Sequence, residues 1–128
     1  MAMLRNPSDV VERPAAPASV QHLFVYGTLV PGKPFAYVLA GIAGQWTPAV
    51  LRGRVSNEGW AARFGYPGLV PDENGVEVGG LVLSSAALLQ HWDRLDKFEE
   101  VGYRRRIANA TLQGGTQVQA HVYALRYG

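Results

Sequence analysis

The sequence predicts an α+β fold, with a small mixed, mostly antiparallel, barrel-like sheet of about five or six strands and about two helices. Short apolar and β-branched segments outnumber those whose apolar residues recur at helical spacing. Strands and helices do not alternate regularly, which argues against a doubly wound parallel sheet. The last two strand candidates, residues 103–112 and 117–127, flank Gly114-Gly115 and therefore predict a hairpin.

Four segments organise the first half of the chain. Residues 22–26 form an apolar run that predicts a buried strand, and residues 35–43 carry apolar side chains at the spacing of a short helix. Residues 46–55 are apolar and β-branched enough for a strand, in which Pro48 indicates an edge or a bulge. Residues 56–72 are rich in glycine and aromatic residues and predict a long surface loop, a kind of segment that is often functional.

The second half begins with a strand at residues 77–83, where Gly79-Gly80 indicates a bulge or a close backbone approach. Ser84 or Ser85 can cap the next helix, which we expect to run to about Asp96. The expected apolar stripe of that helix comprises Leu88, Leu89, Trp92 and Leu95.

The composition fits one globular domain. A chain of 128 residues with 48% apolar residues is long enough to bury a core. Three of the eight prolines fall within residues 1–19, among alanines and serines. We therefore expect a flexible Pro/Ala-rich leader at residues 1–19 and the folded domain at residues 20–128.

The charges and missing residue types exclude several classes of function. Twelve basic and ten acidic residues give a net charge of only +2, which does not predict a nucleic-acid partner. The absence of cysteine excludes disulfides, thiolate metal sites and cysteine nucleophiles. No apolar run approaches the ~18 residues of a membrane span, and the N-terminus lacks the apolar core of a signal peptide. We expect a cytoplasmic protein with no membrane partner.

Common catalytic motifs are also missing from the sequence. It contains no P-loop, no dinucleotide-binding glycine fingerprint and no nucleophile elbow. The three histidines, His22, His91 and His121, lack the spacing of metal ligands, so we interpret them as structural or surface groups.

The stretch Tyr26-Gly27-Thr28-Leu29 is the first candidate site. Gly27 permits unusual backbone angles and leaves room for a ligand, and N–H groups beyond the strand end could form a nest for an anion. The simpler interpretation is a strand that stops at a glycine turn. Spacing alone favours this simpler interpretation, because a four-residue motif carries little information.

The stretch LDKFEEVGYRRR, residues 95–106, is the second candidate. A carboxylate held in a partly buried cleft at a helix C-terminus should have a raised pKa, as a general base working near neutral pH requires. For Asp96 and Glu100 we favour a solvated helix end that faces Lys97 and the arginines. Glu99 follows Phe98, which we expect to point into the core, and the local sequence leaves open whether Glu99 faces solvent or a cleft.

The run Arg104-Arg105-Arg106 raises the possibility of nucleic-acid binding. In a strand, Arg104 and Arg106 share one face and Arg105 lies on the other. Because the net charge is small, we favour an exposed strand whose arginines pair with nearby acids.

Taken in order, several segments resemble the gamma-glutamylcyclotransferase-like family, which includes the gamma-glutamylamine cyclotransferases. These segments are FVYGTL, GYPGLVPD, GGLVLSS, LDKFEE with the following YRR, and VYALRY, and they span about residues 22–127. Their order and spacing are more specific than any one of them. The resemblance implies a small mixed barrel that needs no metal or cofactor.

The resemblance also implies a site. Backbone groups of Gly27, Thr28 and Leu29 would hold the alpha-carboxylate and amine end of a gamma-glutamyl group, with Tyr26 beside them. Glu99 matches the catalytic glutamate of the family.

One position departs from the family pattern, and a further loop is implied. Glu100 stands where the family usually has glycine, and it adds a second acid next to Glu99. Tyr66 and Pro67, in GYPGL, match a loop near the cavity.

The implied reaction converts a gamma-glutamyl amine, amino acid or peptide into 5-oxoproline and a free amine, with a small-molecule substrate as the partner. The substrate's own alpha-amine attacks its gamma-carbonyl while Glu99 moves the proton. The alternative is a small-molecule-binding or regulatory module that keeps the cavity without turnover, because a fold can persist after its chemistry is lost.

Overall fold

The computed structural model describes residues 20–26, 36–56, 68–99 and 102–125. In chain order the elements are β2 (Gln21–Val25), η1 (Ala36–Val38), β3 (Gln45–Ser56), β4 (Gly68–Pro71), β5 (Val76–Ser85), η3 (Ala86–Gln90), α2 (Trp92–Glu99), β6 (Tyr103–Leu112) and β7 (Gln117–Leu125), where η marks a 3₁₀ turn. The expected leader, residues 1–19, lies outside the described residues. No helix among the described residues is long and apolar enough to cross a membrane.

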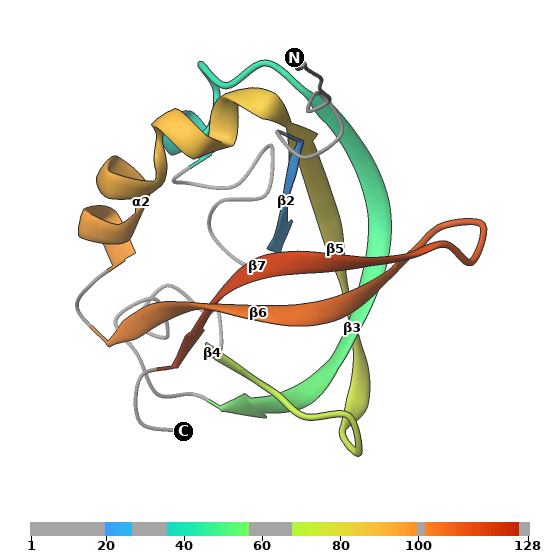
Figure 1. Cartoon of the computed structure of the whole chain (residues 1–128). Helices are drawn as coiled ribbons and strands as arrows, with labels where there is room; N and C mark the ends of the chain where they lie inside the picture. The colour runs from blue at the N-terminus through green and yellow to red at the C-terminus, as the bar shows by residue number, and fades with distance from the viewer. Residues whose placement is uncertain (1–19, 27–35, 57–67, 100–101, 126–128) are drawn as a thin grey trace, which may run out of the picture.

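The strands form one sheet that closes on itself (Figure 1). Their order is β4-β3-β5-β2-β7-β6, and β3 also pairs with β6, which completes the barrel. The pairings are antiparallel except between β2 and β7, which run parallel. The expected α+β fold with a mostly antiparallel, barrel-like sheet is thus confirmed.

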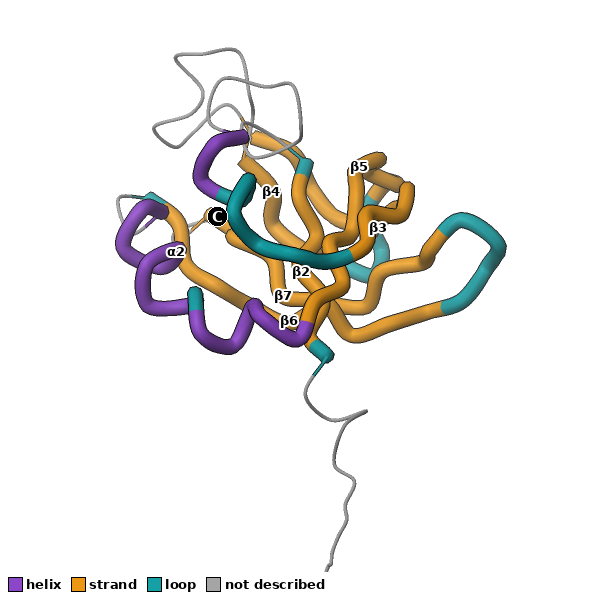
Figure 2. The backbone as a smooth tube through the Cα atoms, turned by 90° about the horizontal axis from the view of Figure 1, so that it is seen from above, coloured by secondary structure: helices purple, strands orange, loops and turns teal. Residues whose placement is uncertain are grey.

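Two apolar clusters lie on the two faces of this sheet. The first contains residues from each of the six strands and fills the barrel, with Phe24, Leu51, Leu69, Val82, Ala110 and Val122 among its members. The second lies under the helical turns and includes Leu23, Leu83, Leu88, Trp92 and Leu95. Because neighbouring strand residues point to opposite faces, Leu23 and Phe24 belong to different clusters. Figure 2 shows α2 lying along one side of the barrel.

The helices differ from the expected ones. Of the helix expected over residues 35–43, the described residues 36–43 form only the 3₁₀ turn η1, and the Leu39 N–H donates to the Ala36 carbonyl at 3.0 Å. The helix expected to run to about Asp96 is divided into η3 and α2 at His91, whose N–H donates to the Leu88 carbonyl at 2.9 Å. Hydrogen bonds that span three residues tighten the backbone into 3₁₀ turns, and this rotates Leu89 out to solvent.

The prediction of a loop over residues 56–72 is wrong for its last part, and residues 57–67 lie outside the described residues. Residues 68–71 form β4, which pairs antiparallel with β3 and buries Leu69 completely. Gly68 permits this placement, because a Cβ there would lie 2.5 Å from the Leu125 side chain. The other strands begin and end within about two residues of their expected positions.

The local signals for the cap and the hairpin are confirmed. Ser85 is the N-cap of η3, and its hydroxyl accepts the Ala87 N–H at 3.0 Å. Gly114 and Gly115 turn the chain between β6 and β7 with φ angles of +100° and +102°, which favour glycine.

Gly80 marks a close backbone approach, as its position in the sequence indicates. It pairs with Ala49 in a continuous β3–β5 register, without a bulge. A Cβ at Gly80 would collide with the Val25 carbonyl oxygen and lie 2.8 Å from the Phe24 ring, whereas a Cβ at Gly79 would meet nothing within 4 Å.

We expect Gly80→Ala to lower the free energy of unfolding by about 1–3 kcal/mol, because it overpacks the contact with Phe24. The matched control Gly79→Ala should leave it unchanged or raise it by about 0.4–1 kcal/mol. Urea unfolding of both variants measures the difference. Equal stabilities would contradict the close approach.

Candidate active site

Two of the residues implied as functional by the family resemblance are described in the structure. Tyr26 directly follows β2, and Glu99 is the last residue of α2. The others, Gly27, Thr28 and Leu29, lie outside the described residues. The same is true of Tyr66 and Pro67, and of Glu100. The geometry that can be compared with the expectation is therefore that of Tyr26 and Glu99.

The helix α2 carries Glu99 on its buried face. Trp92 and Leu95 are buried on α2, and Glu99 follows at the next position of the same stripe. Its side chain is only 7% exposed, which is unusual for a glutamate. The helical spacing of Trp92, Leu95 and Glu99 is the signal in the sequence that could have predicted the buried orientation of Glu99.

Burial changes the acidity of Glu99. Desolvation raises its pKa from 4.5 to about 7. The negative end of the helix dipole acts in the same direction, because Glu99 ends α2. No ion pair or hydrogen bond to its carboxyl group is found among the described residues. A carboxyl group of this kind can take up and return a proton near neutral pH.

Tyr26 ties together three strands at the end of β2. Its hydroxyl donates to the Tyr123 carbonyl at 2.6 Å and accepts the Leu69 N–H at 3.1 Å. Its ring stacks with that of Phe24, with 6.1 Å between the centroids. The hydroxyl is thus occupied by main-chain partners, which fixes the point where β2 ends.

Tyr26 and Glu99 lie close enough for their charges to interact. Burial is the main cause that raises the pKa of Tyr26, and the negative charge of Glu99 adds to it. Burial also raises the pKa of Tyr123, with smaller contributions from Asp96 and Glu99. The ends of β2 and α2 therefore lie within electrostatic reach of each other.

The sequence did not predict which individual residues contact Asp96. Its Oδ1 accepts hydrogen bonds from the Tyr123 hydroxyl at 2.6 Å and from the Arg105 Nε at 3.0 Å. The expectation that Asp96 faces the arginines is confirmed, and Arg105 lies 4.3 Å over the Trp92 ring. Arg104 and Arg106 are exposed while Arg105 is half-buried, as expected for a strand with two faces.

The histidines have structural partners. Arg105 donates to His121 Nδ1 at 3.1 Å, so the proton of the neutral ring lies on Nε2, which donates to the Gln21 side chain at 3.1 Å. Burial lowers the pKa of His121, which favours this neutral form. His22 contacts Ser84 at 2.8 Å. Within the part of the chain that the structure describes, no group of three acidic or histidine side chains could hold a metal ion.

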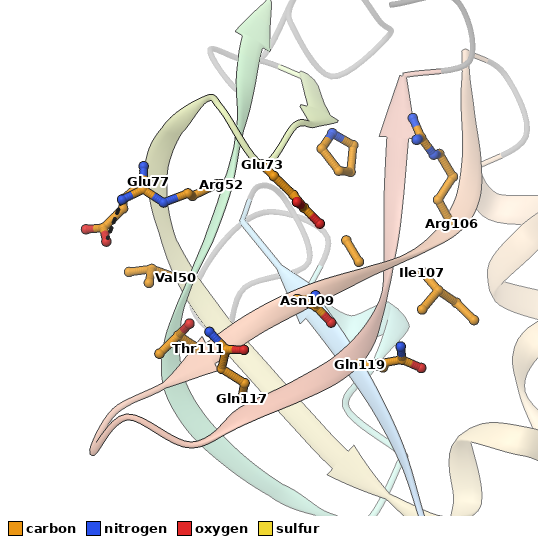
Figure 3. Close-up of a pocket in the computed structure, with 12 residues that line it drawn as sticks. Val50, Arg52, Glu73, Glu77, Arg106, Ile107, Asn109, Thr111, Gln117 and Gln119 are labelled. Carbon is orange, nitrogen blue, oxygen red and sulfur yellow. Dashed lines mark ion pairs between the residues drawn. The ribbon is translucent and has the colours of Figure 1, made fainter.

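A separate open cavity of about 540 Å³ lies between the β3–β5 side of the barrel and the β6–β7 hairpin (Figure 3). Its lining is mainly polar and comprises Val50, Arg52, Pro71, Glu73, Glu77, Arg106, Ile107, Ala108, Asn109, Thr111, Gln117 and Gln119. Arg52 is already paired with Glu77 at 3.7 Å. Neither Tyr26 nor Glu99 lines this cavity, so it is distinct from the neighbourhood described above.

Comparison with known proteins identifies a family. The model of the family described as "Gamma-glutamyl cyclotransferase, AIG2-like" matches residues 23–127. No curated protein matches the chain significantly.

Solved structures share the fold. YkqA from Bacillus subtilis is 25% identical with a TM-score of 0.64, over 84% of this chain and 36% of that chain, so the present chain spans about a third of its length. An AIG2-like protein from Mus musculus is 24% identical with a TM-score of 0.62, over 85% of this chain and 79% of that one. A gamma-glutamyl cyclotransferase specific to glutathione from yeast is 14% identical with a TM-score of 0.56, over 82% and 68%.

The pH dependence of stability tests the burial of Glu99. The pKa of Glu99 is about 7 in the folded protein, above the value of 4.5 for a glutamate in water. The contribution of its protonated carboxyl group to the free energy of unfolding is therefore fully present below pH 4.5 and is lost as the pH rises through 7. The free energy of unfolding of Glu99→Gln, relative to that of the wild type, should therefore rise by about 3 kcal/mol between about pH 4 and about pH 8. Urea unfolding at both pH values measures this gain.

The matched control is Asp93→Asn, which changes an exposed carboxylate in the first turn of the same helix. It should show no such gain, since Asp93 interacts favourably with the helix N-terminus when ionised. A gain of equal size in both variants would argue against a buried Glu99.

Proposed function

Because the chain belongs to the gamma-glutamyl cyclotransferase, AIG2-like family, we propose that it is an enzyme that cyclises the gamma-glutamyl group of a small molecule. The substrate is a gamma-glutamyl amine, amino acid or peptide. The products are 5-oxoproline and the free amine. The chain's own residues supply the proton transfers and the positioning, with no metal or cofactor in the reaction.

The bonds and protons balance within the substrate and one acid–base group. The alpha-nitrogen of the substrate forms a bond to its gamma-carbonyl carbon, and the gamma-amide C–N bond breaks. The alpha-ammonium nitrogen loses two protons and keeps the third as the lactam N–H, while the leaving nitrogen gains two and departs as an ammonium group. A single carboxyl group can carry these protons one at a time from one nitrogen to the other. The nucleophile belongs to the substrate, so no serine or cysteine nucleophile is needed.

Glu99 is the proposed acid–base group, and its burial is the observation that carries this assignment. A carboxyl group with a pKa of about 7 is ionised often enough to accept a proton and acidic enough to return it. An exposed carboxylate with an ordinary pKa would accept a proton poorly. The place of Glu99 at the buried end of α2 supports this role.

The proposed substrate clamp is the segment that follows β2. Backbone groups of Gly27, Thr28 and Leu29 hold the alpha-carboxylate and amine end in this proposal, and Tyr26 stands beside them. What supports it is the family membership and the electrostatic proximity of Tyr26 and Glu99. Folding the substrate so that amine and carbonyl meet can lower the barrier by about 7–11 kcal/mol.

The loop that carries Tyr66 and Pro67 is proposed to border the substrate site on the side of the leaving amine. This assignment rests on the match of GYPGL to the family.

We expect 5-oxoproline to form when the protein is incubated with at least one member of a panel of gamma-glutamyl amines, amino acids and peptides. Glu99→Gln should lower kcat by about 10²–10⁴-fold, because it removes the acid–base group. Mass spectrometry of 5-oxoproline measures both. Asp93→Asn is the control on the same helix and should retain turnover.

Two outcomes would change the proposal. Loss of turnover in Glu100→Gln but not in Glu99→Gln would transfer the acid–base role to Glu100. Thermal stabilisation by a panel compound, without any product, would instead favour a binding module that keeps the cavity.

The pH profile provides a second test. Because Glu99 acts as a base, kcat/KM should rise with pH along an acid limb whose apparent pKa is about 7. Initial rates at subsaturating substrate measure this limb. The residual activity of Glu99→Gln should lack it, and a limb near 4.5 in the wild type would contradict a buried base.

A further inference from the structure

Three side chains from three elements meet beside the last turn of α2. Asp96 lies on α2, Arg105 on β6 and Tyr123 on β7. We refer to these three residues as the Asp96 clasp. None of them is among the site residues assigned above.

The clasp has the geometry of a strong polar contact. Arg105 binds both carboxylate oxygens of Asp96, with Nε 3.0 Å from Oδ1 and Nη2 3.3 Å from Oδ2. The Tyr123 hydroxyl donates to the same Oδ1 at 2.6 Å. A bidentate arginine–carboxylate pair is more directional than a single contact. The side chains of Arg105 and Asp96 are 27% and 42% exposed, so solvent screens the pair only in part.

The guanidinium is itself held from two sides. It lies 4.3 Å over the Trp92 ring, and its Nη1 donates to His121 Nδ1 at 3.1 Å. The Trp92 and His121 rings contact each other with 4.4 Å between centroids. Contacts other than those with Asp96 therefore hold the Arg105 guanidinium in place. This makes the clasp a rigid link between α2 and the sheet.

The clasp holds the residue that begins the last turn of α2. Asp96 lies one helical turn before Glu99. Its hydrogen bonds to Arg105 on β6 and Tyr123 on β7 tie the start of this turn to the sheet. This attachment limits how far the last turn can unwind.

We propose that the Asp96 clasp is a positioning device that keeps the last turn of α2 closed and so holds the Glu99 carboxyl in its buried site. Asp96, Arg105 and Tyr123 are then positioning residues, which do not touch the substrate. The catalytic consequence rests on the proposed function. The placement of Glu99 can be measured without turnover.

The proposal predicts a particular direction for the change in the pKa of Glu99 when the clasp is removed. Two phenols interact with the charge of Glu99, namely Tyr26 directly after β2 and Tyr123 on β7. Loss of the Arg105 cation would not by itself lower the pKa of Glu99, because removing a positive charge can only disfavour the ionised form of a carboxyl group. Opening of the last turn would instead lower it, because water would reach the carboxyl group.

The experiment is a ¹³C NMR titration of the Glu99 carboxyl carbon, assigned by its absence in Glu99→Gln. In Arg105→Gln we expect the pKa of Glu99 to fall by about one pH unit or more, from about 7 toward 4.5. Tyr123→Phe, which keeps the ring and removes the hydroxyl, should move it in the same direction. The acid limb of kcat/KM should move with it.

The matched control is Arg106→Gln, which removes an exposed arginine from the same strand. The pKa of Glu99 should not fall in this variant. If Arg105→Gln does not fold, Tyr123→Phe decides the question alone, since it is the milder change.

The outcomes separate the two proposals. A pKa of Glu99 that stays or rises in the clasp variants overturns the positioning role. A fall in the pKa with no 5-oxoproline from the wild type supports the clasp and rejects the proposed reaction. A fall in the pKa of Glu99 together with a shifted acid limb of kcat/KM supports both the clasp and the proposed reaction.

Discussion

Closure of the sheet by β3 is the constraint on which the rest of the structure depends. β3 pairs with β5 along most of its length, with β4 near its end and with β6 through Ala49–Leu51. Without the β6 pairing the sheet would be an open ribbon with two free edges. With it, the end of β2 is held between β5 and β7, where the Tyr26 hydroxyl reaches both Tyr123 and Leu69. The same closure places α2 against the outer face of the barrel, so that the helix must end beside the tyrosines.

The end of α2 combines opposing contributions to stability. Burying Glu99 disfavours its ionised form, and this cost acts at neutral pH. Trp92 and Leu95 are buried on the same helical face, and each such side chain stabilises the folded state by about 1.5–3 kcal/mol. A carboxyl group can therefore stay buried because its neighbours on the stripe anchor the helix. This arrangement is typical of sites where function is retained at the expense of local stability.

Much of the sheet could be predicted from the sequence, because strands 103–112 and 117–125 carry regular apolar patterns and an unambiguous glycine turn. The 3₁₀ turns could not, since hydrogen bonds that span three residues leave no distinct periodic signal in so few residues. β4 was missed because only four residues pair, and the pairing partner lies in β3. The family resemblance was confirmed by the match over residues 23–127. The partners of Asp96 were beyond local reasoning, because Tyr123 comes from a strand that only the closed barrel brings near.

The chemistry available at this end of the barrel is limited by which polar groups are already occupied. Among the described residues, Ser85 and Glu99 are the buried polar or charged side chains. The Ser85 hydroxyl donates to the Ala43 carbonyl and accepts the Ala87 N–H, so it is committed to the start of η3. The hydroxyls of Tyr26 and Tyr123 are committed in the same way, to main chain and to Asp96. Of Ser85 and Glu99, Glu99 is thus the one whose side chain has no such commitment within the described part of the chain. A reaction in which the substrate brings its own nucleophile requires no more than one such group.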